Sequence, residues 1–182
     1  MKNNSVKSVV AVGIGAALFF VLGRFVAIPS PIPNTNISLQ YAVLGLLAAM
    51  YGPIAGGLIG FIGHTLIDLS WGGSVWWSWV IASAFVGVIV GLVANRLKLE
   101  EGDFGKGKFI TFLVANVVAH AVAWIGIAPV LDILMFAEPA NKVFSQGVFA
   151  AIANMLTAVV VGGLLIVAYT RTIAKKGSLD KE

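Results

Sequence analysis

Long apolar tracts, separated by short polar segments, occupy most of this chain. Between Ser8 and Asn95 the only side chains that are charged at neutral pH are Arg24 and Asp68, and His64 is the one further group that can take up a proton there. A charged group costs roughly 2.5–3.5 kcal/mol at the centre of a bilayer on insertion scales, so charge-free tracts of this length are typical of membrane spans. The pattern therefore predicts an all-α integral membrane protein.

The polar breaks predict six transmembrane helices in a single transmembrane domain over residues 1–182. Three prolines between residues 29 and 33 end the first apolar tract, and Tyr51-Gly52-Pro53 makes a tight turn between the second and the third. The second tract is shorter than the bilayer is thick, so we expect it to be tilted or buried among its neighbours. A loop over residues 132–142 is expected before the last span. The expected spans are residues 6–28, 39–50, 53–68, 75–97, 109–131 and 143–173.

The basic residues predict the orientation of these spans. Six spans place both termini on one side, which then has ten basic residues, whereas the other side has only Arg24 and Lys142. This asymmetry follows the positive-inside rule, so both termini are expected in the cytoplasm and the segments 29–38, 69–75 and 132–142 outside. The ten residues on the cytoplasmic side are Lys2, Lys7, Arg96, Lys98, Lys106, Lys108, Arg171, Lys175, Lys176 and Lys181.

Composition narrows the chemistry that the chain can perform. Hydrophobic residues make up 59% of it and charged residues 11%, with a mean hydropathy of +0.96, whereas a soluble domain has roughly 25% charged residues. No cysteine is present, and the sequence has no HExxH, Gly-x-Ser-x-Gly or phosphate-binding-loop motif. The net charge of +4 comes from basic residues at helix ends, which argues against a nucleic-acid partner. We therefore expect no enzymatic activity, no metal and no cofactor.

Polar and aromatic residues within the expected spans are the candidates for ligand binding. The fourth span begins Trp76-Trp77-Ser78-Trp79, and three indoles about 100° apart on a helix cannot all face lipid. An aromatic belt at the membrane interface and a pocket are both open for Trp77, and the pocket is favoured for Trp76 or Trp79.

Two helical stripes add further candidates. Asn116, His120 and Trp124 follow one another at intervals of four residues, as do Gln146, Ala150 and Asn154. Lipid leaves polar groups unsatisfied, so these side chains must face protein or a cavity. Packing between helices is favoured for Asn116, packing and ligand contact are both open for His120 and Asn154, and ligand contact is favoured for Trp124 and Gln146.

Two charged residues near the outer ends of spans are expected to pair with each other. Asp68 follows His64 by four residues, and Arg24 lies at a matching depth on the first span. An ion pair between Asp68 and Arg24 is favoured over ligand contact by either residue.

Particular segments of the chain resemble the substrate-binding S components of energy-coupling factor (ECF) vitamin transporters, in the riboflavin-transporter-like branch. The most specific of them is the Pro-Asn-Thr-Asn-Ile-Ser-Leu-Gln sequence after the first span. The similar segments are Ala11-Val-Gly-Ile-Gly-Ala-Ala-Leu-Phe19, Leu22-Gly-Arg-Phe25, Ile32-Pro-Asn-Thr-Asn-Ile-Ser-Leu-Gln-Tyr-Ala42, Gly60-Phe-Ile-Gly-His64 and Trp76-Trp-Ser-Trp79.

The resemblance implies a six-helix subunit of a bacterial cytoplasmic membrane. Such a subunit binds a vitamin near the outer face and works with a transmembrane T component and two ABC ATPases. It also implies that small residues on the first span dock onto the T component. The matching residues here are Ala11, Gly13, Gly15 and Ala17.

The binding hypothesis is a planar heteroaromatic vitamin or precursor stacked on an indole of Trp76, Trp79 or Trp124. Amides at the ring edge would supply donors and acceptors, with the 29–38 segment as a lid stiffened by its prolines. The expected amides are Asn34, Asn36, Gln40, Gln146 and Asn154.

The cargo and two other functions stay open. Riboflavin and a hydroxymethylpyrimidine precursor of thiamine fit equally well as the cargo. A membrane scaffold or assembly subunit without a small-molecule ligand is the alternative function. A stand-alone facilitator is a third, against which the lack of inverted repeats argues.

Overall fold

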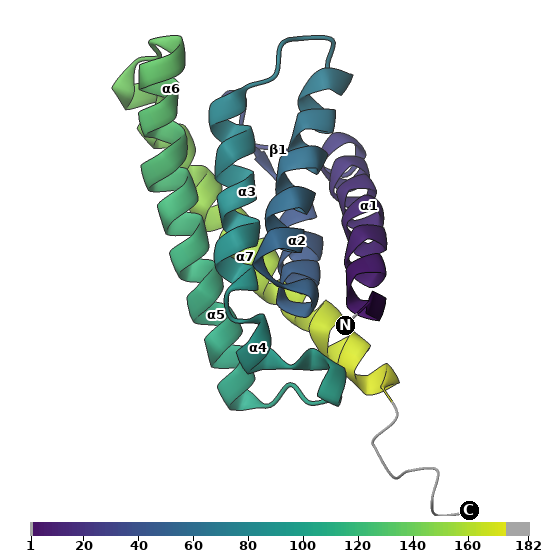
Figure 1. The fold of residues 1–182 in the computed structure, drawn as a ribbon. Coiled ribbons are helices and arrows are strands. Elements are labelled where there is room, and N and C mark those ends of the chain that lie inside the picture. The colour runs from purple at the N-terminus through teal and green to yellow at the C-terminus, as the bar shows by residue number, and fades with distance from the viewer. Residues whose placement is uncertain (1, 174–182) are drawn as a thin grey trace, which may run out of the picture.

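Helices form nearly all of the structure, a computed structural model that describes residues 2–173, with side chains from residue 6 onward (Figure 1). In this part of the chain, five helical segments are long and apolar enough to cross a membrane: Val6–Phe25, Gln40–Ser70, Trp77–Glu101, Lys106–Phe136 and Ala140–Thr172. The all-helical membrane fold expected from the apolar tracts is therefore confirmed. The elements are α1 (Lys2–Phe25), β1 (Ile28–Pro29), β2 (Asn36–Ile37), α2 (Gln40–Ser70), α3 (Trp77–Gly91), α4 (Ala94–Leu97), the 3₁₀ helix η1 (Leu99–Glu101), α5 (Lys106–Ala121), the π-helix η2 (Val122–Ile127), α6 (Ala128–Phe136) and α7 (Ala140–Thr172).

Helix α2 is a hairpin of two helical halves. Gly52 has φ 86° and ψ −176°, a conformation that glycine adopts readily, and Pro53 lacks the N–H group that a continuous helix would need. Both Gln40 and Ile67 pack against Gly23 of α1, although a straight helix would separate these two residues by about 40 Å. The chain therefore turns back at Gly52, where the sequence predicted the break between the second and third spans.

The second half of α2 packs closely against α3. A Cβ atom on Gly56 would collide with the carbonyl group of Gly87, and one on Gly87 would collide with the backbone of Gly56. Glycines at such a crossing let two helix backbones approach more closely than larger residues would allow. This contact joins the second half of α2 to the later part of α3, whose first turn contributes to the cavity described below.

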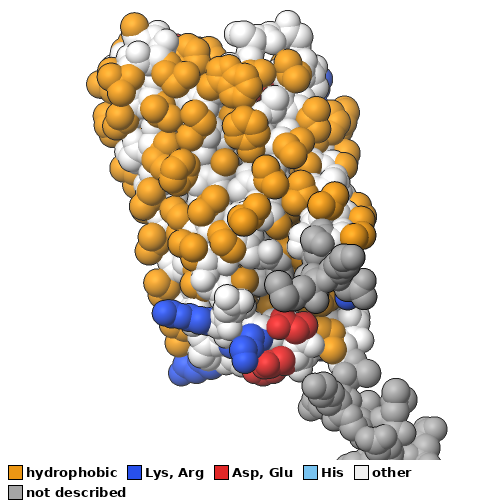
Figure 2. All heavy atoms as spheres, viewed as in Figure 1, with side chains coloured by type: hydrophobic (Ala, Val, Ile, Leu, Met, Phe, Trp, Pro, Cys, Tyr) orange, Lys and Arg blue, Asp and Glu red, His pale blue; other side chains and the backbone are white. Residues whose placement is uncertain are grey.

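Charged residues gather at one end of the bundle, with an apolar surface above them (Figure 2). The start of α1, the end of α7 and the α4–η1 segment all lie at this end (Figure 1). Lys108 pairs with Asp103 at 3.4 Å, and Lys98 pairs with Glu101 at 3.5 Å. The side chain of Lys2 and the residues Lys175, Lys176 and Lys181, which were counted in the charge asymmetry, lie outside the described residues.

The connection before the last helix differs from the expected loop over residues 132–142. Helix α6 extends to Phe136 and α7 begins at Ala140, so the connection consists of residues 137–139 alone. Asp132 is helical and only 1% exposed. A charged residue after an apolar run suggested a loop, but the hydrogen bonds described below stabilise this carboxylate within a helix.

Candidate substrate-binding site

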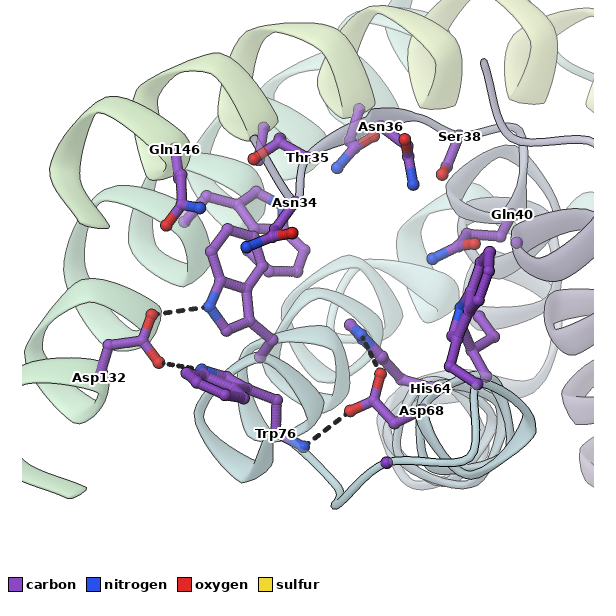
Figure 3. Close-up of a pocket in the computed structure, with 18 of the residues that line it drawn as sticks. Asn34, Thr35, Asn36, Ser38, Gln40, His64, Asp68, Trp76, Asp132 and Gln146 are labelled. Carbon is purple, nitrogen blue, oxygen red and sulfur yellow. Dashed lines mark hydrogen bonds and ion pairs between the residues drawn. The ribbon is translucent and has the colours of Figure 1, made fainter. Parts of the chain in front are cut away.

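A cavity of about 670 Å³ lies at the end of the bundle opposite the charged end. It is enclosed by the segment between α1 and α2, the ends of both halves of α2 that lie away from Gly52, the start of α3, the π-helix η2 and the first half of α7 (Figure 3). The lining residues are Gly23, Asn34, Thr35, Asn36, Ser38, Gln40, Tyr41, His64, Ile67, Asp68, Trp71, Gly73, Ser74, Trp76, Trp79, Trp124, Asp132, Glu138, Lys142, Gln146, Ala150 and Asn154.

One wall of the cavity is the segment over residues 28–38, which we call the outer segment because the charge asymmetry predicts this part of the chain outside the membrane. Ile28 pairs with Ile37 and Pro29 with Asn36 in a short antiparallel hairpin. Gln146 of α7 donates a hydrogen bond of 2.8 Å from Nε2 to the carbonyl oxygen of Pro33. The outer segment is therefore a folded part of the cavity wall that α7 holds in place near its tip.

A second hydrogen bond holds the base of the outer segment. Thr157 of α7 donates from Oγ1 to the carbonyl oxygen of Ser38, over 2.8 Å. Both the tip and the base of the segment are thus attached to the same helix. Movement of the tip away from the cavity would require the bond from Gln146 to break.

Asp132 orients the aromatic residues at the start of α3. Its carboxylate accepts hydrogen bonds from Trp76 Nε1 at 2.6 Å and from Trp79 Nε1 at 2.7 Å (Figure 3). The hydroxyl group of Ser78 is a third donor to it. Three donors satisfy most of the hydrogen-bonding capacity of this buried carboxylate. The positions of two cavity-lining indoles therefore depend on a residue of α6. Trp77, by contrast, is 41% exposed and stacks on Phe61, outside the cavity lining.

Trp124 reaches the cavity from the π-helix η2. A π-helical turn shifts the helical register by one residue, and such turns occur often at functional sites. The Trp124 ring lies 5.2 Å from the Trp79 ring and 5.5 Å from the Tyr41 ring, measured between centroids. Its carbonyl group packs against Gly147, where a Cβ atom would collide with it. Trp124 is 0% exposed, and its Nε1–H group has no hydrogen-bond partner among the described residues.

Asp68 and His64 form the side of the cavity opposite the outer segment (Figure 3). Asp68 Oδ2 accepts a hydrogen bond of 2.8 Å from the backbone N–H of Trp76, and its Oδ1 lies 3.7 Å from His64 Nε2. On its other side, His64 Nδ1 lies 2.6 Å from the hydroxyl oxygen of Ser83, which also contacts Tyr41. A chain of polar contacts therefore runs from Asp68 at the cavity into the core of the bundle.

The expected ion pair between Asp68 and Arg24 is wrong. The guanidinium carbon of Arg24 lies 3.8 Å above the centroid of the Trp71 ring, a cation–π contact. The ion pairs among the described residues do not include Arg24. Asp68 instead caps the turn before α3 through Trp76.

Eight of the nine residues predicted to bind substrate line this cavity, and His120 does not. Its Nδ1 lies 2.9 Å from the carbonyl oxygen of Asn116, and its ring meets the edge of Tyr41 at 5.7 Å. His120 therefore packs against the lining residue Tyr41 but does not itself line the cavity. The eight are Asn34, Asn36, Gln40, Trp76, Trp79, Trp124, Gln146 and Asn154.

Sequence reasoning missed the structural contribution of Asp132 and the position of Tyr41. The spacing of the WWSW motif gave no sign that both flanking indoles share one acceptor 53 and 56 residues away. In the part of the chain that the structure describes, no group of three or more His, Asp or Glu side chains could hold a metal ion.

The fold and the cavity define the class: a polytopic helical membrane protein with a ligand-sized polar cavity at one end. The chain belongs to the family of ECF-type riboflavin transporter S components, whose family model matches residues 3–171. Its fold is similar to that of the crystal structure of an S component for biotin from an ECF-type ABC transporter, with a TM-score of 0.61 and 17% identity, over 91% of this chain and 94% of that one.

Curated relatives cover the full length of the chain. A UPF0397 protein of Exiguobacterium sp. is 54% identical over 182 residues, which is 100% of both chains. The UPF0397 protein YdcD of Lactococcus lactis subsp. lactis is 52% identical over the same length. A UPF0397 protein of Enterococcus faecalis is 49% identical over 178 residues, covering 98% of this chain and 97% of its own. The family is one of transporter S components and not of enzymes.

Proposed function

We propose that this chain captures a vitamin or vitamin precursor in the cavity and delivers it as the substrate-binding subunit of an ECF-type importer. Riboflavin and a hydroxymethylpyrimidine or thiamine-like compound are the two candidate cargoes. The observation that supports this function is the cavity itself, together with a buried side-chain atom on each of three lining residues, Gln40, Trp124 and Asn154, that has no hydrogen-bond partner among the described residues. Buried polar groups without partners are costly, and a bound ligand can satisfy them.

The proposed topology has six crossings, with the two halves of α2 counted separately. The first half is shorter than a bilayer and is buried among α1, α5 and α7, which supports the expectation of a short internal span. Both termini and the charged end that includes α4 and η1 are then cytoplasmic, following the positive-inside rule. The cavity accordingly faces outward across the cytoplasmic membrane of a bacterium.

A face of α1 is the proposed contact with the T component. Ala11 is buried, and Gly15 packs against Leu47 and Ile59 of α2. Gly13 and Ala17 instead lie on the exposed side of α1, and no atom lies within 4 Å of a Cβ atom built on Gly13. This division favours Gly13 and Ala17 as the docking surface, whereas the other two pack within the bundle.

The docking surface can be tested by co-purification with the T component and the two ATPases. Ala17→Leu should reduce recovery of the complex because the larger side chain prevents close helix approach. Ala121→Leu, at an exposed position on α5, is the matched control and should leave recovery unchanged. Equal recovery with both variants would place docking on another surface.

The function is tested by mass spectrometry of small molecules released from the detergent-purified protein. Titration of the tryptophan fluorescence with riboflavin, hydroxymethylpyrimidine and thiamine provides a second readout. A stoichiometric vitamin or precursor supports the proposal. A folded protein with no released ligand and no quenching by any of the three compounds would favour the scaffold function.

A further inference from the structure

The cavity lining contains more acidic than basic side chains. Three acidic residues line it, namely Asp68, Asp132 and Glu138, whereas Lys142 is the one Lys or Arg among the lining residues that the structure describes. Lys142 already pairs with Glu138, with Nζ 2.6 Å from Oε2. No unpaired cation is therefore available within this lining to bind a carboxylate or phosphate group of a ligand.

The three carboxylates differ in what already satisfies them. Asp132 accepts three hydrogen bonds from side chains of Trp76 and the first turn of α3, and Glu138 is paired with Lys142. Asp68 has one hydrogen bond from a backbone N–H group, and the nearest ionisable partner is His64 at 3.7 Å. Its side chain is 16% exposed and lines the cavity.

The arginine that could neutralise Asp68 is engaged elsewhere. Arg24 stacks on the Trp71 ring at 3.8 Å. A carboxylate at the wall of a membrane-embedded cavity is costly without a partner, and charge-assisted hydrogen bonds are the strongest way to satisfy it. Asp68 is thus the acidic group of the cavity that has the most remaining capacity to accept a ligand N–H group.

We propose that the ligand is a planar heteroaromatic compound with an amino group whose N–H donors bind Asp68, and that the cavity rejects anionic ligands. This inference rests on the proposed function and selects among its cargoes. It favours an aminopyrimidine over riboflavin, and it excludes phosphate esters of either compound.

Other cavity groups match the remainder of such a ring. Among the lining residues, Trp124 has a buried Nε1–H donor and Asn154 a buried Oδ1 acceptor, and neither atom has a hydrogen-bond partner among the described residues. Trp79, which is partly exposed and packs against Trp124, provides aromatic surface for stacking. An aminopyrimidine offers both a ring-nitrogen acceptor and amino donors in one plane, whereas an aliphatic amine offers no ring to stack.

The test is a binding comparison of four probes on the full-length protein in detergent. The probes are amino-hydroxymethyl-methylpyrimidine, its oxo analogue in which a carbonyl replaces the amino group, its phosphate ester, and riboflavin. Isothermal titration calorimetry should give an affinity for the amino compound at least about tenfold above those for the oxo analogue and the phosphate ester, since hydrogen bonds to a charged group are stronger than neutral ones. This comparison is made within the unaltered protein, so it does not depend on how any variant folds.

Variants then assign the preference to Asp68. Asp68→Asn keeps an oxygen to accept the Trp76 N–H bond but removes the negative charge, so the preference for the amino compound should fall to about threefold or less. Asp103→Asn, which removes a carboxylate at the opposite end of the bundle with a side chain 67% exposed, is the control and should keep the full preference.

The outcomes separate this inference from the proposed function. Equal binding of the oxo analogue, tight binding of the phosphate ester, or an unchanged preference in Asp68→Asn would overturn the inference alone. Riboflavin as the one probe that binds, or a co-purified ligand without an amino group, would also overturn it while supporting the proposed function. No binding of any probe and no co-purified ligand would overturn both. A co-purified amino heteroaromatic whose affinity falls at least about tenfold in Asp68→Asn would support both.

Discussion

Replacing Asp132 by asparagine should destabilise the protein and displace the two cavity-lining indoles of α3. The carboxylate accepts hydrogen bonds from Trp76 Nε1 on one oxygen and from Trp79 Nε1 on the other, with Ser78 as a third donor. An asparagine side chain keeps one acceptor oxygen and presents an N–H₂ group to the other indole. One partly buried indole N–H group therefore loses its acceptor and faces a second donor.

The size of this effect follows from the number of bonds lost. A hydrogen bond to a charged group contributes about 1.5–3 kcal/mol, and a buried donor left unsatisfied costs a similar amount. Ser78 and Trp76 donate to the same carboxylate oxygen, so an asparagine oxygen at that position keeps both bonds, and we count one lost indole bond. Asp132→Asn should then lower the free energy of unfolding by about 2–3 kcal/mol.

Two measurements check this value. Chemical unfolding in mixed micelles gives the change in the free energy of unfolding, and the tryptophan emission spectrum reports the changed surroundings of Trp76 and Trp79. Asp103→Asn, which removes one exposed ion pair at the opposite end of the bundle, should leave the emission spectrum unchanged and alter the free energy of unfolding by about 1 kcal/mol or less. An Asp132→Asn variant that unfolds within about 0.5 kcal/mol of the unaltered protein and keeps its emission spectrum would refute the argument, because surface substitutions alone produce changes of that size.

Three further substitutions test other parts of the structure. Trp124→Ala should weaken ligand binding by about 1–3 kcal/mol in a fluorescence titration while membrane insertion stays normal, and Trp77→Ala, outside the cavity, should leave affinity unchanged. Gln146→Leu removes the bond to the tip of the outer segment, worth about 0.5–1.5 kcal/mol, and should speed ligand release in stopped-flow experiments; an unchanged release rate would contradict that role. Gly56→Val should cost about 1–3 kcal/mol or more and reduce the yield of monodisperse protein in size-exclusion chromatography, whereas Gly13→Ala should not.

The backbone of the bundle could largely be predicted from the apolar pattern. The break at Tyr51-Gly52-Pro53 was predicted because proline cannot continue a helix and glycine adopts positive φ, and α2 turns back there. The segment near Asp132 could not be predicted in the same way. Its charge suggested a loop, and the donors that make a helical position favourable come from α3, more than fifty residues earlier in the chain. Hydrogen bonds from residues so distant in the chain leave no pattern in the sequence around Asp132.

The partners of the two charged residues could not be predicted from the sequence either. Arg24 and Asp68 are the two charged residues in a long apolar region, so their mutual attraction was the simplest expectation. Yet each has a closer partner from the segment over residues 71–76: the Trp71 ring for Arg24 and the Trp76 backbone for Asp68. Arg24 and Asp68 therefore each interact with this tryptophan-rich segment, and not with each other as their charges alone suggested.

The stripe of Asn116, His120 and Trp124 shows why spacing finds candidates but does not separate ligand contacts from packing. Asn116 donates to the carbonyl group of Phe112, and His120 contacts the carbonyl group of Asn116, so two of the three use oxygens of their own helix. Trp124 follows at the same interval, but the π-helix changes the register there and its N–H group finds no such partner. Lipid forces all three residues inward because it cannot satisfy polar groups. Asn116 Oδ1 and His120 Nε2 are also buried without a partner among the described residues, so the lack of a partner does not distinguish Trp124. What distinguishes Trp124 is its place in the cavity lining at the π-helical turn, which the regular interval of the three residues does not reveal.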